Sequence, residues 1–501
     1  MSGGAASIAV AAANREARVD RGRWIALIVL CIGTLMIVLD MTIVNVALPA
    51  IQRDLGFSQS SLAWVVNAYL IPFGGLLLLA GRLGDLLSRK WVFMAGLALF
   101  MLASLLCGVA QSQAVLIGAR FLQGIGGAFT SAVVLGMIVT MFPEPGQQAR
   151  AIGVYSFVAS AGASIGLLLG GVLTQTLSWH WIFFVNVPIG IVTAIIAARL
   201  IERDRGIGFG NGADVLGAFL ITSSLMLGVY TIVEAANYGW GSLHTLVLGA
   251  FALGLLGAFL AREARTANPL IPLRIFRSRN VAAANLIQAV MVAGMFGMFF
   301  LGSLYMQRVL GYDALEIGLA FLPVALLIGT LSLGFSARLN TRFGARATLI
   351  PGLVLIIAAL ALLTRAPVDG HYPVDLLPAM IFAGIGAGLT FPSLMTLAMS
   401  GATRSDSGLA SGLVNTSLQV GGALGLAVLA TLSTTRTDKL LAAGDSPAAA
   451  LTGGYHVAWI IGAGLVLAAI ALAITVVESA RVAPAEAKVA TAERAYAEGC
   501  G

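Results

Sequence analysis

The sequence from residue 24 to residue 48 reads WIALIVLCIGTLMIVLDMTIVNVAL and carries a single charged side chain, Asp40. About 20 mostly apolar residues suffice for a helix to cross the hydrocarbon core of a bilayer. The apolar part of a cleaved signal peptide is shorter, roughly 7–15 residues. This stretch is therefore predicted to be a membrane-crossing helix with an acid inside it.

The rest of the chain has the same character. Of its 501 residues, 59% are hydrophobic and only 10% are charged, whereas an ordinary soluble domain carries about 25% charged residues. Too few polar side chains remain to cover a water-soluble globule. The composition excludes a soluble enzyme or a nucleic-acid-binding protein as the main interpretation.

Fourteen apolar stretches are long enough to be spans. Because the bilayer core offers no water to backbone amides, we expect each span to be a helix and the fold to be an all-α integral membrane protein. The approximate bounds of the fourteen predicted transmembrane helices are 24–48, 62–80, 91–110, 114–141, 151–175, 181–199, 214–234, 243–261, 281–306, 316–337, 347–364, 376–399, 407–432 and 456–477.

The basic residues predict the orientation. If the N-terminus is cytoplasmic, the inner segments contain 23 of the 29 Lys and Arg residues and the outer segments contain five, while Arg120 falls inside a span. Cytoplasmic loops carry such an excess of positive charge. The split predicts cytoplasmic termini, and it explains the formal net charge of +7 without nucleic acid.

The spans divide into two similar blocks. The sequence GRLGDLLSRK at 81–90 follows the second span, and GFSARLNTRFGAR at 334–346 follows the equivalent span of the second block. Two six-helix halves with a helix pair between them are a transporter layout. The predicted units are a cytoplasmic N-terminal segment (1–23), an N-terminal six-helix bundle (24–199), a linker with two inserted helices (200–280), a C-terminal six-helix bundle (281–477) and a cytoplasmic tail (478–501).

Two ionisable side chains lie well inside spans. Asp40 and Arg120 are placed at similar depths toward the outer side of the first and fourth spans. A charge at membrane depth costs about 2.5–3.5 kcal/mol on insertion scales and usually has a function. We expect the two to pair, and a neighbouring guanidinium can tune how readily a buried carboxyl exchanges a proton. The alternatives are a static ion pair between two helices and a contact with substrate alone.

Other side chains inside spans are candidates for lining a cavity. Uncharged polar groups can equally join helices through hydrogen bonds, and the aromatic rings can equally pack against lipid or protein. The candidates are Asn45, Asn67, Gln123, Phe296, Phe300, Asn415 and Gln419. Neither a metal-ligand spacing nor a phosphate-binding glycine loop is found, so we expect no metal, no cofactor and no ATP-driven step.

Several motifs together resemble the major facilitator superfamily, specifically its fourteen-helix drug:proton antiporter group (QacA/EmrB type). The resemblance covers nearly the whole chain and implies the major facilitator fold. It is carried by LDMTIVNVALP at 39–49, GRLGDLLSRK at 81–90, RFLQG at 120–124, WHWIFFVNVPIG at 179–190, NPLIPLR at 268–274 and SGLVN at 411–415, continuing through Gly425.

The resemblance also implies roles for particular residues. Asp40 and Arg120 correspond to the proton-coupling acid and the arginine that acts on it. Gly81, Asp85, Arg89 and Lys90 correspond to a cytoplasmic latch that stabilises the outward-facing state. The antiporter motif of the fifth helix is matched by Gly162, Gly166, Gly170 and Gly171.

Three positions depart from the family pattern. Leu167 stands where the antiporter motif normally has proline, which puts the bend of that helix in question, and Ser88 stands where the loop motif normally has glycine. In the similar motif of the second block, at 334–346, Arg338 stands where the first block has Asp85. No latch role is therefore carried over to Arg338.

The predicted function is proton-coupled efflux of lipophilic drugs, antibiotics or toxic compounds by alternating access, from the cell membrane of a bacterium. Its partners would be a small-molecule substrate, protons and the lipid bilayer. One alternative is a dedicated exporter of a single endogenous product, such as an antibiotic, a lipid or a siderophore. An alternative of another class is a membrane sensor or scaffold that transports nothing.

Overall fold

The computed structural model describes residues 2–142, 144–201, 206, 208, 214–266, 269–271, 273–400 and 407–477, and the described elements are all helical. The first group comprises α1 (Ser2–Leu55), α2 (Gln59–Leu86), α3 (Arg89–Gly108), α4 (Gln113–Met141), α5 (Pro145–Thr176), α6 (Trp181–Phe184) and α7 (Asn186–Leu200). These helices pack on one another, with α1 against α5, α4 and α7, and α4 against α2 and α3.

The second group packs together in a similar way. It comprises η2 (Leu273–Arg277), α10 (Arg279–Arg308), α11 (Ala314–Thr330), η3 (Leu331–Phe335), α12 (Ser336–Phe343), α13 (Ala345–Leu363), η4 (Tyr372–Leu376), α14 (Leu377–Ser400), α15 (Ser407–Ala442) and α16 (Pro447–Thr475). Here α10 packs against α15 and α16, and α13 against α14. The two groups meet where α2 contacts α15 and α5 contacts α11.

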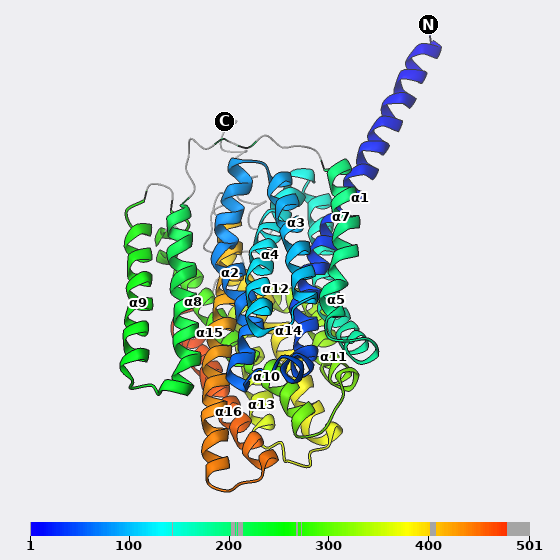
Figure 1. Cartoon of the computed structure of the whole chain (residues 1–501). Coiled ribbons are helices and arrows are strands. Elements are labelled where there is room, and N and C mark those ends of the chain that lie inside the picture. The colour runs from blue at the N-terminus through cyan, green and yellow to red at the C-terminus, as the bar shows by residue number, and fades with distance from the viewer. Residues whose placement is uncertain are drawn as a thin grey trace.

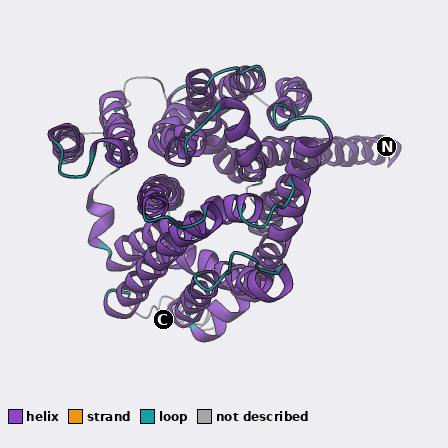
Figure 2. Ribbon diagram, turned by 60° about the horizontal axis from the view of Figure 1, so that its bottom comes forward, coloured by secondary structure: helices purple, strands orange, loops and turns teal. Residues whose placement is uncertain are grey.

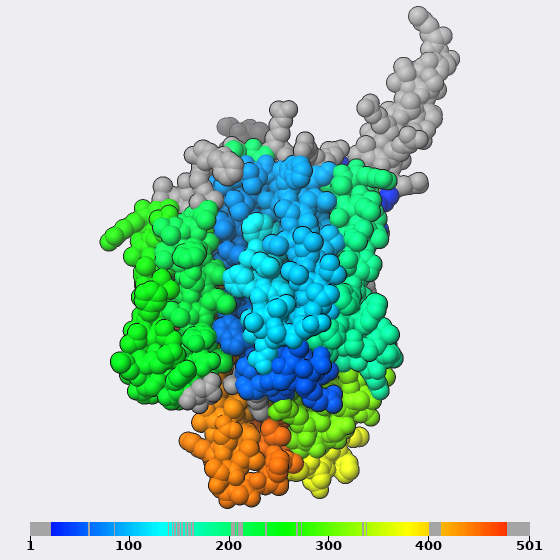
Figure 3. Space-filling model, in the orientation of Figure 1, coloured from blue at the N-terminus to red at the C-terminus, as the bar shows by residue number. Residues whose placement is uncertain are grey.

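A helical hairpin stands beside these two groups. It consists of α8 (Val215–Tyr238) and α9 (Leu243–Glu263), shown in green in Figure 1. The helix α8 contacts α9, α2 and α15, and Figures 2 and 3 show the hairpin at the edge of the helix assembly. We call the end of the assembly from which the N-terminal part of α1 projects the upper face, and the opposite end the lower face (Figure 1).

Serine side chains fix the starts of several helices. A hydroxyl that accepts a hydrogen bond from a backbone N–H of the first turn satisfies a group that has no partner within the helix. Ser58 caps α2, Ser112 caps α4 and Ser242 caps α9 in this way. Ser88, which departs from the family pattern, caps α3 by accepting from the backbone N–H of Trp91.

Two predicted spans contain local irregularities. The span expected at 181–199 is present as one membrane-length stretch, Trp181–Leu200, with a turn at Val185 between α6 and α7. Pro188 explains this turn, because it has no N–H to donate to the carbonyl of Phe184. The span expected at 316–337 is divided into α11, the π-helical turn η3 and part of α12.

Twelve described helices are long and apolar enough to cross a membrane. Two shorter apolar stretches, Ile165–Thr176 in α5 and Ala314–Thr330 in α11, occupy the places of two further predicted spans. A multi-helix membrane protein is thus confirmed, and the count of fourteen stays a prediction.

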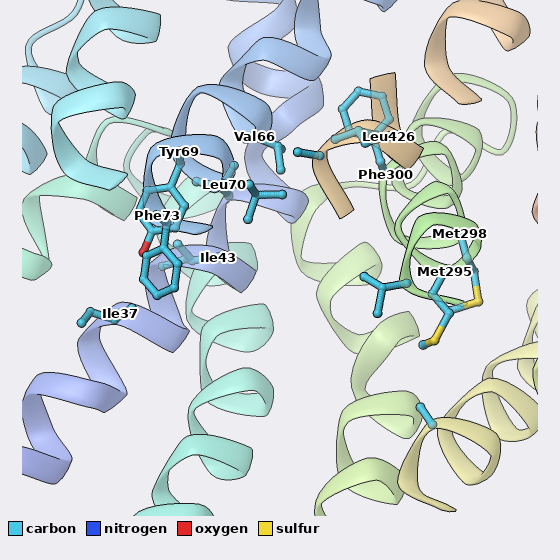
Figure 4. Packing of buried hydrophobic residues seen from close by; sticks show 14 of the residues in the cluster. Ile37, Ile43, Val66, Tyr69, Leu70, Phe73, Met295, Met298, Phe300 and Leu426 are labelled. Atoms are coloured by element: carbon cyan, nitrogen blue, oxygen red, sulfur yellow. The ribbon is translucent and has the colours of Figure 1, made fainter. Parts of the chain in front are cut away.

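The interior is filled by apolar side chains from both groups. Figure 4 shows Tyr69 and Phe73 of α2 near Ile43 of α1, with Met298 and Phe300 of α10 on the other side of the view. The rings of Tyr69 and Phe73 stack with their centroids 5.6 Å apart. This packing holds α1, α2 and α4 around the polar site described next.

Candidate functional site

Asp40 and Arg120 form a buried ion pair inside the first helix group. Arg120 Nη1 on α4 donates to Asp40 Oδ2 on α1 over 2.6 Å. The two side chains are 0% and 1% exposed. Two residues that are 80 positions apart in sequence thus form the contact that their similar depths predicted.

Three uncharged side chains complete the surroundings of the carboxylate. Gln123 Nε2 of α4 and Asn186 Nδ2 of α7 donate to Asp40 Oδ1 over 2.7 and 2.9 Å. Both amides also donate to Ser104 Oγ of α3, over 2.6 and 3.2 Å. Asp40 therefore accepts three hydrogen bonds, and the site joins α1, α3, α4 and α7.

The guanidinium of Arg120 is held from the other side by α2. Arg120 Nε donates to the backbone carbonyl of Val65 over 2.9 Å. Its guanidinium carbon lies 4.4 Å from the centroid of the Tyr69 ring, a cation–π distance. Gly124, one turn later on α4, allows this approach, because a Cβ at that position would lie 2.8 Å from Pro72 Cγ of α2.

The spacing on α4 accounts for part of this geometry. Arg120 and Gln123 lie three positions apart, so they occupy the same face of the helix, and Arg120 Nη1 also donates to Gln123 Oε1 over 2.7 Å. Gln123 therefore bonds both members of the pair. A buried ion pair is stable only when such additional bonds satisfy its remaining donors and acceptors.

The arrangement can respond to a proton. Attraction between opposite charges is strong where water is excluded, and a proton on Asp40 would cancel the negative charge that Arg120 faces. Every hydrogen-bond partner given above lies within α1–α4 and α7. The site therefore lies within one helix group, and none of the hydrogen-bond partners given above comes from the second group.

Glycines on α5 set the distance between α5 and its neighbours. A Cβ at Gly162 would lie 2.9 Å from Leu35 Cδ1, and one at Gly170 would lie 2.9 Å from the carbonyl oxygen of Ile43. These contacts run along α1 past Asp40. Gly171 faces α11 instead, where a Cβ would lie 2.8 Å from the carbonyl oxygen of Ala314.

Leu167 also lies on this line of contact. It is buried, and a Cβ at Gly318 of α11 would lie 2.6 Å from its carbonyl oxygen. The described part of α5 continues as a helix through this position. Leucine at 167 keeps the backbone N–H that the family proline lacks, and α5 packs closely on α11 there.

Gly166 should not tolerate even a methyl group. Its Cβ would lie 3.0 Å from the carbonyl oxygen of Leu39 and closer still to Thr42 Oγ1. Because backbone cannot give way as a flexible side chain can, we expect Gly166→Ala to destabilise the protein by about 1–3 kcal/mol. Thermal unfolding in detergent would measure this. The matched control is Gly118→Ala, where nothing lies within 4 Å of the new Cβ, and equal unfolding temperatures for the two variants would contradict the prediction.

The predicted latch residues lie at the upper ends of α2 and α3. Arg89 Nη1 donates to the carbonyl of Gly136 on α4 over 3.2 Å, and Lys90 Nζ donates to the carbonyl of Ala198 at the end of α7 over 2.8 Å. Gly81 lies on α2 facing α4. The side chain of Asp85 lies outside the described part of the structure.

The candidate cavity residues lie in different surroundings. Gln123 belongs to the ionic site, Asn67 is buried on α2 with its amide unpartnered, and Gln419 is buried on α15 against Gly74. The structure does not bring the seven side chains together. Of the remaining four, Asn45 donates a hydrogen bond to a backbone carbonyl of its own helix, and Asn415 is exposed. Phe300 is buried in the core, and Phe296 packs on Gly422.

An apolar groove of about 650 Å³ lies between α2, α4 and α8. Trp64 and Phe121 line it, and each is the chain neighbour of a site residue, Val65 and Arg120 respectively. Its lining also includes Thr222, whose buried hydroxyl has no hydrogen-bond partner.

Three residues of the site were not expected from the sequence to lie beside the Asp40–Arg120 pair. Ser104 and Tyr69 carry no signal that separates them from packing residues. Asn186 does have one, since it is a polar side chain within the apolar run WIFFVNVPIG at 181–190, a motif already quoted. All three are 0% exposed.

The chain is similar to known proteins both in sequence and in fold. Residues 30–426 match the sequence profile of the Major Facilitator Superfamily. The chain resembles an autoinhibited peptide transporter of the POT family (TM-score 0.67, 16% identity, covering 92% of this chain and 99% of that one). It also resembles an inward-facing bacterial homologue of the lysosomal transporter Spinster (TM-score 0.60, 17% identity, 90% and 96% coverage).

Curated relatives are resistance and export proteins. The puromycin resistance protein pur8 of Streptomyces alboniger is 40% identical over 92% of both chains. The cephamycin export protein CmcT of Amycolatopsis lactamdurans is 39% identical over 82% of this chain and 85% of its own. The multidrug resistance protein Stp of Mycobacterium tuberculosis is 32% identical over 82% and 76%. This protein belongs to the major facilitator superfamily.

Proposed function

We propose that this protein exports lipophilic antimicrobial compounds across the bacterial cell membrane in exchange for protons. The observation that carries the proposal is the buried Asp40–Arg120 pair with its amide partners, a carboxyl at membrane depth that can exchange a proton against a fixed guanidinium. The relatives named for resistance and export support the substrate class.

The proposed topology places the upper face in the cytoplasm. It follows from the bias of Lys and Arg toward that side. In this topology both termini are cytoplasmic and the pair lies toward the outer side of the membrane. α5 and the continuous run from α11 to α12 complete fourteen spans, in two six-helix bundles (24–199 and 281–477) with two inserted helices between them.

Transport would proceed by alternating access. Protonation of Asp40 from the outside would weaken its attraction to Arg120, and the two bundles would rock about the contact between α5 and α11. Release of the proton to the cytoplasm would restore the ion pair. The glycines at 162, 166, 170 and 171 would let α5 pivot closely on α1 and α11, and the 81–90 loop would act as the cytoplasmic latch.

One proton per cycle supplies enough free energy. A charge that crosses a potential of about 100 mV releases about 2.3 kcal/mol. At about 1.4 kcal/mol per decade, this supports a substrate gradient of roughly 50-fold. A pH difference of one unit would add about a factor of ten.

Transport into inverted membrane vesicles tests the proposal. Vesicles with the wild-type protein should accumulate a fluorescent lipophilic cation when a proton gradient is imposed, and a protonophore should abolish the accumulation. Vesicles without the protein are the control. Uptake that ignores the proton gradient, or no turnover at all as the sensor or scaffold hypothesis predicts, would reject the proposal.

A dedicated exporter is the second candidate. Several relatives are named for one compound each, among them the cephamycin export protein and the tetracenomycin C resistance and export protein. We expect cells that express this protein to become several-fold less susceptible to members of several chemical classes, including puromycin. Resistance confined to one class across a diverse panel would favour the dedicated exporter.

A further inference from the structure

A second group of buried charges lies at the upper ends of the inserted helices, away from the Asp40–Arg120 pair. Asp214 caps the start of α8, where its Oδ1 accepts the backbone N–H of Gly217 over 2.8 Å. The same oxygen accepts Arg262 Nε of α9 over 2.6 Å. One carboxylate oxygen thus fixes the start of α8 to the end of α9.

Glu263 extends this group to the chain that leads into α10. Its Oε2 accepts the backbone N–H of Ile271 over 2.7 Å. Glu263 and Asp214 are each only 3% exposed, although both lie at helix ends where solvent could hydrate a carboxylate. The group therefore ties together α8, α9 and residues 269–271.

One oxygen of each carboxyl group has no partner. Asp214 Oδ2 and Glu263 Oε1 are both buried without a hydrogen bond among the described residues. They border the same small space, because a single point, where a Cβ would stand on Gly217, lies 2.6 Å from Asp214 Oδ2 and 3.0 Å from Glu263 Oε1. The absence of a side chain at residue 217 leaves this space open.

The charges of the group do not balance if both acids are ionised, since two carboxylates would share one guanidinium. The surfaces around them are apolar, with Leu79 and Leu83 of α2, Phe259 of α9 and Leu270. Charged side chains on the neighbouring segments include Arg82 on α2, Arg265 after α9 and Arg274 on η2. Two like charges in a buried site repel strongly, and a buried acceptor without a donor is costly.

We propose that Asp214 and Glu263 bind one proton between them, as an O–H of one acid that donates to the free oxygen of the other. This second proton-binding site leaves the group of Asp214, Arg262 and Glu263 electrically neutral. Loss of the proton sets two carboxylates against each other beside Gly217, next to the bond between Glu263 and Ile271 at the start of the segment that leads to the second helix bundle. The inference does not depend on efflux.

Infrared spectroscopy tests the shared proton directly. Difference spectra of the full-length protein in detergent, recorded between mildly acidic and mildly alkaline pH, should show a protonated-carboxyl band that is lost as the pH rises. We expect Glu263→Gln, Asp214→Asn and the double variant each to lose the same single band, equivalent to one carboxyl group per molecule. The matched control is Asp445→Asn, an exposed acid on the lower face, which should leave the spectrum unchanged.

Two outcomes would overturn the proposal. A Glu263→Gln spectrum identical to that of the wild type would show that no proton is held there. A band that disappears when sodium replaces N-methylglucamine, together with sodium stabilisation of the wild type but not of Glu263→Gln, would assign the site to a cation instead. Neither readout measures transport, so each is separate from the test of the proposed function.

Thermal unfolding provides a second measurement if infrared bands overlap. A native state that binds one more proton than the unfolded state loses stability as the pH rises. Glu263→Gln keeps the shape of the side chain and cannot titrate, so the wild type should show this decline and the variant should lack that component. Equal declines in both proteins would contradict the shared proton.

Discussion

Replacing Asp40 with Asn should abolish proton-driven accumulation in inverted vesicles, a loss of the roughly 50-fold gradient that one charge supports at about 100 mV. The amide cannot release or bind a proton in the physiological range, but it is nearly the same size as the carboxyl group. Its oxygen can still accept from Arg120, which donates to Asp40 over 2.6 Å. The packing around the site should therefore survive while the coupling is lost.

Two further measurements make this result specific. The Asp40→Asn protein should still bind substrate and exchange labelled for unlabelled substrate across the membrane without a gradient, because alternating access itself does not require a titrating group. Asp438→Asn, an exposed acid at the end of α15, should pump at the wild-type rate. Full accumulation by Asp40→Asn at wild-type expression would exclude Asp40 as the coupling residue.

Replacing Arg120 with Leu should destabilise the protein by about 3–5 kcal/mol, because it leaves the carboxylate of Asp40 buried without its counter-charge. The change also removes the hydrogen bond to the carbonyl of Val65 and the contact with the Tyr69 ring. Denaturant or thermal unfolding in detergent would measure the loss, with surface expression as a second readout. The matched control is Arg436→Leu, an exposed arginine on α15.

The double variant separates a static ion pair from a coupling site. Asp40→Asn combined with Arg120→Leu contains no unpaired buried charge, so it should recover much of the stability that Arg120→Leu loses. Transport driven by protons should stay absent. If the double variant regained both stability and pumping, the pair would serve only to join α1 to α4. If it were no more stable than Arg120→Leu, the unpaired charge would not be the cause of the loss.

Most of the fold followed from the sequence because the bilayer imposes a simple rule. A run of apolar residues must form a helix there, so hydropathy alone located the spans. Hydropathy did not show the local backbone irregularities inside two of these spans. Pro188 explains a turn between α6 and α7 within the single stretch Trp181–Leu200, and a π-helical turn at Leu331–Phe335 interrupts the span expected at 316–337.

The candidate site was only partly visible in the sequence. Asp40 and Arg120 were found because charged side chains inside apolar runs are costly and therefore conspicuous. Gln123 was found as a cavity candidate, whereas the structure makes it a bridge between the pair. The contacts of Ser104 and Tyr69 with this site were not expected, because small hydroxyls and aromatic rings are common in membrane helices whatever they contact.

The sequence by itself determined that this is a helical membrane protein, and it predicted two similar blocks with one acid and one arginine inside spans of the first. The tertiary structure decided which side chains from α1, α2, α3, α4 and α7 meet around that pair, and that Asp214 and Glu263 share a space beside Gly217. The physical reason is that hydropathy acts along each segment separately. Hydrogen bonds and charge pairing depend on how helices rotate and approach one another, and that is fixed by glycine contacts and side-chain packing far apart in the chain.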